Sequence, residues 1–442
     1  MNAGQMPPFP ACSPNSLVSD QSDSSRVLSA TSAAVGFFFS FRSILVLFFA
    51  RGLGVGTEAG VIASSLIGFS LLMLVSFQAA GRFTHPITSV WRVSTMRWVL
   101  AFLAFSLCSL GWTASISPLA SSLYWLTLAF DVATVALLFR IHSSNVVLHS
   151  IIKGFVWSTV ILALVAWAMP LQADLRLGDE EYFNTNQIGN LCAIAIFLHQ
   201  LLRAEKAFGS WTPSLLLALT LLRSLSKTTL AAFALGQLYL FFRNKWMSRK
   251  QKLILAACAV CVILAFGGLF ESYFDIYSTT GNQAETLTGR TAIWAYSLEA
   301  ALQKPWFGNG IDSMWKVFPP FGGDLFEARH AENELLQQFV AYGVMGVILL
   351  IGLYGSLFRR VRSLPAGASR ITLIAFLIFI VVRGLAEAEP FDLLLPLWLM
   401  TALSMSTTGS TGVGGIKSDG GRFYRESARK LGGQTTSGSL QV

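Results

Sequence analysis

The sequence predicts an all-α integral membrane protein with about twelve transmembrane helices. Hydrophobic residues make up 53% of the 442 residues, and the mean hydropathy is +0.58. Only 12% of the residues are charged, whereas a soluble globular protein carries about 25%. The apolar residues form long blocks separated by short charged clusters, as expected for spans of roughly 20 residues that each cross ~30 Å of hydrocarbon. Composition therefore excludes a water-soluble fold of this length.

Twelve apolar blocks are candidate spans. The seventh is too short to cross the bilayer unaided, so we expect it to be tilted, extended, or one half of a broken helix buried among its neighbours. In chain order the blocks lie near residues 33–50, 60–79, 97–115, 119–139, 154–170, 188–202, 211–222, 228–242, 253–270, 335–357, 371–384 and 391–405.

The two ends of the chain differ from the rest in composition. Residues 1–32 are rich in Ser, Pro and Asp, and residues 406–442 are rich in Gly, Ser and Thr. Neither segment can bury a core, so both are predicted to be disordered. No signal peptide is expected, because the first apolar block follows about 30 polar residues. The polytopic membrane domain is therefore predicted to cover residues 33–405.

The distribution of positive charge predicts the orientation. Placing the N-terminus in the cytoplasm puts most of the 32 lysines and arginines on the cytoplasmic side, as the positive-inside rule requires. The densest clusters are residues 243–252, residues 359–370 and the basic tail. Twelve spans then leave both termini in the cytoplasm of a bacterial inner membrane. These loops explain the net charge of +9, which implies anionic membrane lipids as a partner and no nucleic acid.

Two outer cations break this charge rule. Arg223 and Lys227 flank two serines in the short outer connection between the seventh and eighth blocks. Long basic side chains at a span end can simply snorkel to the interface. Two cations at one depth also match the converging donors that a phosphate group needs. We therefore predict an anion-binding site at this connection.

The longest outer connection covers residues 271–334. Loops above about 15 residues are usually functional or disordered, and this one contains a predicted amphipathic helix from Thr288 to Leu302. A turn-rich run follows at residues 305–310. Because aromatic residues lie among the charges, we expect the loop to pack on the membrane face of the protein.

This outer loop also contains a candidate base. His330 is the only one of the five histidines on the predicted outer side. A lone interfacial histidine is often a structural polar residue, but an imidazole can accept a hydroxyl proton at neutral pH, and Glu332 can orient or replace it. Arg290 and Arg329 lie on the same loop. Cations for a polyanion and a base for an acceptor indicate glycosyl transfer from a phosphate-linked donor.

Other charges in and beside the spans are interpreted as structural. Arg42 and Asp131 fall inside predicted spans, and pairing within the bundle is the simplest explanation. Glu387 and Glu389 precede the last span and are expected to face water. A CxxC pair at residues 258–261 lies in an apolar block without further ligands, so packing is favoured and no metal or cofactor is predicted.

Three amides precede the sixth span. Asn184, Asn186 and Gln187 can orient sugar hydroxyls or a diphosphate. Capping of the following helix is an equal alternative for Asn186.

Six short motifs surround these residues in a characteristic order. They are FNTNQIG at 183–189, SLSK at 224–227, GRTAIW at 289–294, PWFGNG at 305–310, HAENELLQ at 330–337 and YGVMG at 342–346. The region from about 180 to 400 thereby resembles the O-antigen ligase and O-antigen polymerase family of bacterial membrane glycosyltransferases. Each motif is weak alone, and the specificity lies in their order around one large outer loop.

The resemblance implies a glycosyltransferase C-like fold of about twelve membrane helices with one large periplasmic loop. It also implies metal-independent transfer of a glycan from undecaprenyl pyrophosphate to an acceptor hydroxyl. Arg290 would hold the pyrophosphate, Lys227 would assist it, and His330 would activate the acceptor. Fixed cations are the expected source of rate, because the charge of the departing diphosphate develops in the transition state. Membrane lipids and polysaccharide export proteins are candidate partners.

Two positions depart from the family pattern. The family usually places arginine where this chain has Lys227, which keeps the charge but loses the bidentate geometry. Arg223, about one helical turn earlier, can compensate. Many members read His-x-His-Asn or His-Asn where this chain has His330-Ala331-Glu332-Asn333. The base is therefore either His330 or Glu332.

Several acceptors remain open: another lipid-linked repeat, lipid A core, or a protein side chain. We favour polymerisation of exopolysaccharide or O-antigen repeats over ligation and over a protein O-oligosaccharyltransferase, because the outer loop is modest and shows no protein-binding module. The rival from another class is a flippase or transporter of lipid-linked sugars. Such a protein is expected to show internal repeats with charges in both halves, whereas the unusual charges here gather on one face.

Overall fold

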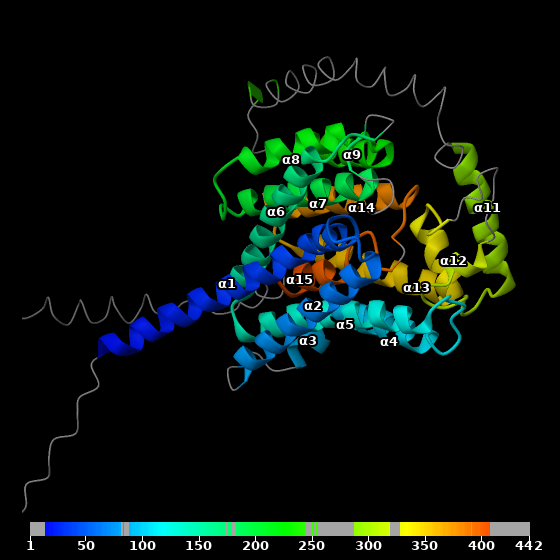
Figure 1. Cartoon of the computed structure of the whole chain (residues 1–442). Helices are drawn as coiled ribbons and strands as arrows, with labels where there is room; N and C mark the ends of the chain where they lie inside the picture. Colours follow the sequence, from blue (N-terminus) through cyan, green and yellow to red (C-terminus); the bar gives the residue numbers. More distant parts are fainter. Residues whose placement is uncertain are drawn as a thin grey trace, which may run out of the picture.

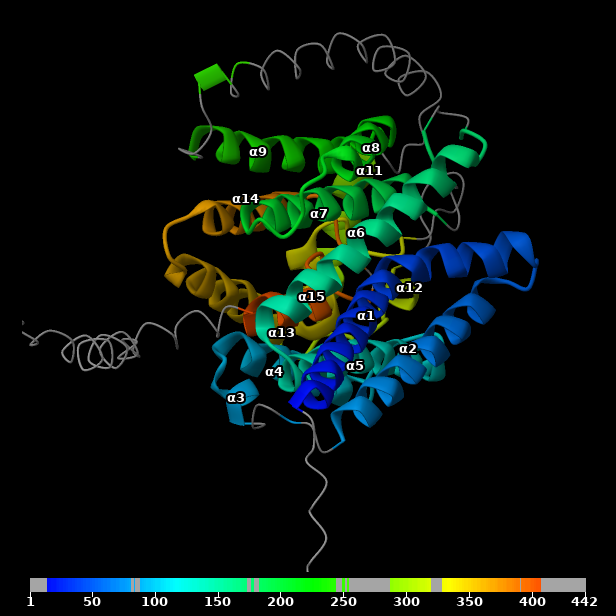
Figure 2. The same cartoon turned by 90° about the vertical axis from the view of Figure 1, so that its left-hand side faces the viewer.

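The computed structural model describes residues 14–80, 83, 88–172, 176–178, 183–243, 249–250, 253, 287–318, 328–389 and 391–406. The regular elements in these ranges are helices gathered into one bundle (Figure 1, Figure 2), which confirms the predicted all-α class. They are α1 (Pro14–Leu47), η1 (Phe48–Gly52), α2 (Thr57–Ala79), α3 (Thr88–Arg92), α4 (Ser94–Ser109), α5 (Pro118–Ile141), α6 (Ser144–Ala168), α7 (Thr185–Ala204), α8 (Thr212–Arg223), α9 (Lys227–Arg243), α11 (Leu287–Gln303), α12 (Met314–Val317), α13 (Glu334–Ser363), α14 (Ala368–Gly384) and α15 (Leu397–Ser406).

Eleven of the twelve predicted spans overlap these helices. The ninth, at residues 253–270, lies outside the described residues apart from its first position. Helix α1 already begins at Pro14, so the N-terminal helix is longer than the predicted span. Five helices of the described residues are long and apolar enough to cross a membrane, which supports a multi-pass protein and leaves the number twelve a prediction. They are Val27–Gly52, Thr57–Ala79, Pro118–Ile141, Ser144–Ala168 and Glu334–Ser363.

Helices α1 and α6 cross at two glycines. A Cβ atom on Gly36 would lie 1.9 Å from the carbonyl oxygen of Ile151, and one on Gly154 would lie 1.9 Å from that of Ala33. Membrane helices associate through such close backbone approach, because lipid tails are as apolar as leucine and give little hydrophobic driving force. The two glycines therefore fix the crossing of α1 and α6.

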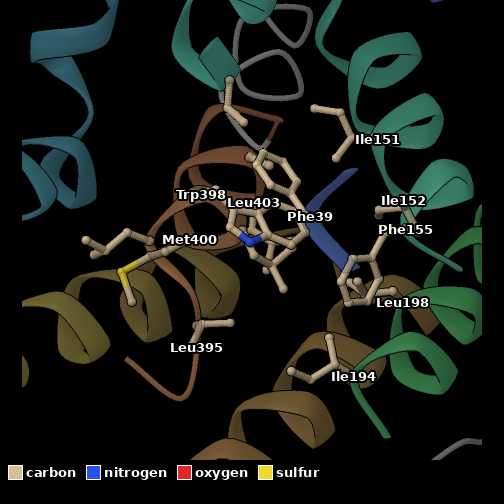
Figure 3. Packing of buried hydrophobic residues seen from close by; sticks show 14 of the residues in the cluster. Phe39, Ile151, Ile152, Phe155, Ile194, Leu198, Leu395, Trp398, Met400 and Leu403 are labelled. Atoms are coloured by element: carbon tan, nitrogen blue, oxygen red, sulfur yellow. The ribbon is translucent and has the colours of Figure 1, made fainter. Parts of the chain in front are cut away.

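Helix α15 lies in the core of the bundle, and all its residues are buried. The ring of Trp398 stacks on that of Phe39 from α1 at a centroid distance of 4.1 Å, and lies 5.4 Å from that of Phe155 from α6. Figure 3 shows these rings among the aliphatic side chains of the core. A helix of this length rises only about 15 Å, so α15 does not cross the hydrocarbon by itself.

The two charges predicted to pair within the bundle do so. Nη2 of Arg42 on α1 lies 2.7 Å from Oδ2 of Asp131 on α5, and the Asp131 side chain is buried. The Arg42 guanidinium also lies over the rings of Phe38 and Phe39. Because an unpaired charge is expensive inside a membrane protein, this contact accounts for both residues structurally.

Helix α13 is interrupted at Gly343, whose φ of 64° lies in the left-handed region. The loop at residues 305–310 fills the interruption, and the amide of Val344 donates a hydrogen bond of 2.7 Å to the carbonyl of Pro305. A Cβ atom at Gly343 would lie within 2.6 Å of the loop backbone, so the contact requires glycine. The PWFGNG and YGVMG motifs are therefore two sides of one packing contact.

Part of the predicted outer segment 271–334 is described, and it lies at one end of the bundle beside α13 (Figure 1). Helix α11 covers the helix predicted from Thr288 to Leu302, which is thereby confirmed. The described part of the loop packs on the start of α13 through a small core of its own. This core consists of Ile293, Ala301, Met314, Phe318, Ala328, Ala331 and Val340.

Candidate active site

Three of the predicted site residues meet where α11 approaches the start of α13. Nη2 of Arg290, in the first turn of α11, lies 3.4 Å from Oε2 of Glu332. The other oxygen of Glu332, Oε1, lies 3.6 Å from Nδ1 of His330. The predicted cation and the two candidate bases therefore form one chain, with the carboxylate in the middle.

The backbone at Glu332 adopts an unusual conformation. Its φ of 49° lies in the left-handed region, which residues other than glycine seldom adopt. Its carbonyl accepts a hydrogen bond of 3.1 Å from Nε1 of Trp294. Asn333 then caps α13 by accepting a hydrogen bond of 3.0 Å from the amide of Leu336, a usual role for asparagine. The motif at 330–337 thus holds both candidate bases beside a helix start.

Glu387 joins this cluster, contrary to the expectation that it faces water. Its side chain is only 3% exposed, and its Oε1 lies 3.1 Å from Nη2 of Arg290. The same oxygen accepts a hydrogen bond of 2.9 Å from Oγ1 of Thr228 at the start of α9. Two donors therefore satisfy a buried carboxylate that would otherwise be costly to desolvate.

Arg383, in the last turn of α14, brings a second guanidinium to the cluster. It is buried, with Nη2 3.9 Å from Oε2 of Glu387 and Nη1 3.7 Å from Oε1 of the more exposed Glu389. Its Nε donates a hydrogen bond of 3.2 Å to Oγ1 of Thr229. Sequence reasoning missed this group. One signal was present, because three charges within residues 383–389 directly after an apolar block favour mutual pairing.

The environment of Glu332 changes its acidity. Burial raises the pKa of Glu332 above the ordinary glutamate value, although the neighbouring His330 and Arg290 oppose the rise. Its Oε2 has no hydrogen-bond partner among the described residues. A carboxyl group with a raised pKa exchanges protons nearer to neutral pH, as groups in active sites often do.

Arg223 and Lys227 lie on either side of the tight turn between α8 and α9. The turn places Leu225 in the left-handed region with a φ of 53°. Thr228, which follows Lys227 directly, contacts Glu387. The predicted anion-binding connection therefore lies next to the Arg290 cluster.

Asn184, Asn186 and Gln187 lie at the start of α7. The side-chain oxygen of Asn184 accepts a hydrogen bond of 2.8 Å from the amide of Asn186, so the capping residue is Asn184. Thr185 in the same turn donates a hydrogen bond to the carbonyl of Ser224. This bond attaches the start of α7 to the turn before α9.

Arg329, which directly precedes His330, contacts an aromatic ring. Its exposed guanidinium sits over the ring of Trp315, 4.7 Å from the centroid. The predicted cationic rim therefore divides into an ion-paired cluster and a separate contact between an arginine and an aromatic ring.

Residues 212–351 match the family model described as O-antigen ligase. Within this range the chain is similar to O-antigen ligases. This match confirms the family resemblance, and it includes Arg290 and both candidate bases but ends before Arg383. No curated protein matches the chain.

The match supports a membrane glycosyltransferase-like role in the assembly of O-antigen or a related polysaccharide, and the matched family implies lipid-linked glycans as substrates. The apolar helices place this role in a multi-pass membrane protein. Among the described residues, no group of three His, Cys, Asp or Glu side chains is arranged to hold a metal ion.

Proposed function

We propose that this protein transfers an oligosaccharide from undecaprenyl pyrophosphate to an acceptor hydroxyl at the periplasmic face of a bacterial inner membrane, without a metal or nucleotide. The observation that carries the proposal is the chain of contacts from Arg290 through Glu332 to His330. It joins an anion-binding cation to a candidate base inside the region that is similar to O-antigen ligases. The bias of positive charge supports cytoplasmic termini, which put this chain of contacts outside.

Arg290 holds the diphosphate of the donor, and Lys227 and Arg223 assist from the turn before α9. Arg290 contacts two carboxylates, of which Glu332 is the more distant and the more exposed. The incoming diphosphate replaces Glu332 at the guanidinium. Cations fixed in this way stabilise the negative charge that develops as the bond between the sugar and the diphosphate breaks.

His330 takes the proton of the acceptor hydroxyl. In the structure, Nδ1 of His330 accepts a hydrogen bond of 3.4 Å from the amide of Glu332 and lies 3.6 Å from Oε1 of the same residue. Uptake of the proton through Nε2 therefore requires the other tautomer, in which Nδ1–H faces the Glu332 carboxylate. The acceptor oxygen forms a bond to the anomeric carbon, and undecaprenyl pyrophosphate departs with the electron pair of the broken bond. Glu332 stabilises the resulting imidazolium, since a carboxylate beside a histidine favours its charged form. In the alternative assignment, Glu332 itself takes the proton, which its raised pKa favours.

The acceptor is proposed to be a second lipid-linked repeat, so that the reaction polymerises exopolysaccharide or O-antigen. Ligation to lipid A core and transfer to a protein hydroxyl use the same donor and base. Deleting the gene separates these possibilities. Glycans of a single repeat indicate a polymerase, a complete polymer that is not attached to lipid A core indicates a ligase, and unchanged lipids with an unmodified protein indicate a protein acceptor.

The Arg290→Ala variant tests the proposed function in the deletion strain. We expect glycan product to fall by roughly 10²–10³-fold, the usual cost of removing a group that stabilises developing charge, while the protein remains inserted. Lys304→Ala is the matched control, because Lys304 is an exposed cation directly after α11, the helix that contains Arg290. Normal product from Arg290→Ala would refute the proposal. If Arg290→Ala instead accumulates lipid-linked sugars on the cytoplasmic side, and the glycan that is still made keeps its full length, a flippase is favoured.

A further inference from the structure

Glu387 holds the most constrained carboxylate in the cluster. It follows α14 and lies beyond the O-antigen ligase match, yet its carboxylate connects three other segments. Oε1 contacts Thr228 at 2.9 Å and Arg290 at 3.1 Å, and Oε2 faces Arg383 at 3.9 Å. These contacts bring α9, α11 and α14 together at one carboxylate.

The two carboxylates at Arg290 differ in how firmly they are held. Glu387 is 3% exposed and shares its Oε1 with a hydroxyl donor, whereas Glu332 is 19% exposed and its Oε2 is 3.4 Å from the guanidinium. Displacing Glu387 would leave a buried charge without its partners, which is strongly unfavourable. Glu332 is therefore the carboxylate that a ligand replaces, and Glu387 stays in place.

We propose that Glu387 is a positioning residue, which fixes the guanidinium of Arg290 relative to the start of α9. Thr228 follows Lys227, so one carboxylate oxygen sets the spacing between the two cations that are proposed to share the diphosphate. Glu387 acts through Arg290 and does not touch the substrate. This inference rests on the proposed function of Arg290.

Arg383 keeps this arrangement together from the side of α14. Its Nε donates to Thr229 while its Nη2 faces Glu387. The guanidinium therefore offsets part of the negative charge of Glu387 and ties the end of α14 to the first turn of α9. With Arg383 present, Arg290 is not the only cation beside Glu387, which leaves Arg290 available to an anion.

The test compares Glu387→Gln with the wild type in the full-length protein. Undecaprenyl pyrophosphate binding is measured in nanodiscs, and glycan product is measured in the deletion strain. Glutamine removes a negative charge beside Arg290, so affinity for the pyrophosphate should be equal or higher. Product should nevertheless fall by about 10- to 100-fold, because displacement of a binding group by about 1 Å can cost 10²-fold in rate.

Two further variants keep the test decisive. Thr228→Val removes the hydroxyl anchor and retains all charges, and it should lower product in the same direction without weakening binding. Glu299→Gln removes an exposed carboxylate from α11, the helix of Arg290, and should leave product unchanged.

Three results would overturn the positioning role. They are normal product from Glu387→Gln, normal product from Thr228→Val, and a loss of product matched by equal losses of pyrophosphate binding and melting temperature. If Arg290→Ala also gives normal product, the proposed function itself fails. If Arg290→Ala gives none while Glu387→Gln is normal, only the positioning role fails.

Discussion

Two groups of buried charge in this protein differ in how their partners satisfy them. Arg42 and Asp131 form a one-to-one pair at 2.7 Å inside the bundle. Arg290 instead faces two carboxylates at 3.1 and 3.4 Å. Both groups leave a buried polar atom without a hydrogen-bond partner among the described residues, Nε of Arg42 and Oε2 of Glu332, so the contact lengths and the number of partners distinguish them. A closed pair with one short contact serves the fold, whereas a guanidinium shared between two carboxylates at longer distances can exchange one of them for a charged ligand.

The largest effect is expected from His330→Gln, which removes the base at the open end of the cluster. Glycan product should fall by about 10²–10⁴-fold, the usual contribution of general base catalysis. The melting temperature should stay unchanged, because the ring is partly exposed. Product is measured by gel in the deletion strain, and melting is followed on purified protein. Equal product from His330→Gln would assign the base to Glu332.

The closed pair of Arg42 and Asp131 should instead affect the thermal stability of the protein. Arg42→Leu leaves Asp131 without its partner, and removal of one member of a buried pair costs about 3 kcal/mol or more. Thermal unfolding of the purified protein measures the loss. The double variant Arg42→Leu/Asp131→Leu should recover most of it, since an apolar pair needs no compensation. If Arg42→Leu melts like the wild type, the pair does not stabilise the fold, and the two groups of charge do not differ in this respect.

The pH dependence of activity is a third way to distinguish the Arg290 cluster from the pair of Arg42 and Asp131. Burial raises the pKa of Glu332, so the ionised form that orients His330 is lost as pH falls through a value above that of an ordinary glutamate. Activity should therefore decline on the acid side at a higher pH than a free carboxyl group would give. Glu332→Gln should remove this component of the decline and leave only the requirement for an unprotonated His330. The raised pKa stabilises the fold at acid pH and loses this contribution as pH rises, so unfolding through this group does not explain the decline. A pH profile of Glu332→Gln with the same acid limb as the wild type, in position and steepness, would contradict the assignment.

The smallest effect is expected from Trp294→Phe. This change removes the hydrogen bond from the indole to the carbonyl of Glu332 and keeps the aromatic ring. A single hydrogen bond contributes about 1 kcal/mol, so product should fall only several-fold. Relative product per inserted protein measures it. Trp294→Phe changes only a contact to the backbone of Glu332. If it lowers product as much as His330→Gln does, the backbone conformation at Glu332 matters more than the Glu332 side chain.

The sequence predicts elements and local pairings well where one physical rule dominates. Apolar blocks located the helices, and the cost of charge in hydrocarbon predicted the contact between Arg42 and Asp131. Helix α11 followed from a local pattern. The partner of Arg290 did not, because Glu387 lies 97 residues further along the chain and no periodicity relates them. In the sequence, Glu387 and Glu389 directly after a span resemble part of a solvated loop. Only the folded structure shows that Glu387 is buried.

The motifs were also easier to recognise than to interpret. PWFGNG and YGVMG lie far apart in the sequence and suggest two separate features. They meet at the interruption of α13, where Gly343 allows the loop backbone to approach. Their role in the fold depends on a close contact that only the three-dimensional arrangement shows. His330 and Glu332 were placed correctly as neighbours, because only one residue separates them.

The proposed function depends on the binding of the donor's diphosphate by Arg290. The most direct test measures binding of undecaprenyl pyrophosphate to the full-length protein in nanodiscs, with undecaprenol as the uncharged competitor. We predict that Arg290→Ala lowers affinity for the pyrophosphate at least about 10-fold, as expected for loss of a charge-assisted contact of ~1.4 kcal/mol or more, and leaves that for undecaprenol unchanged. Equal affinity of Arg290→Ala and wild type for the pyrophosphate would contradict this role of Arg290.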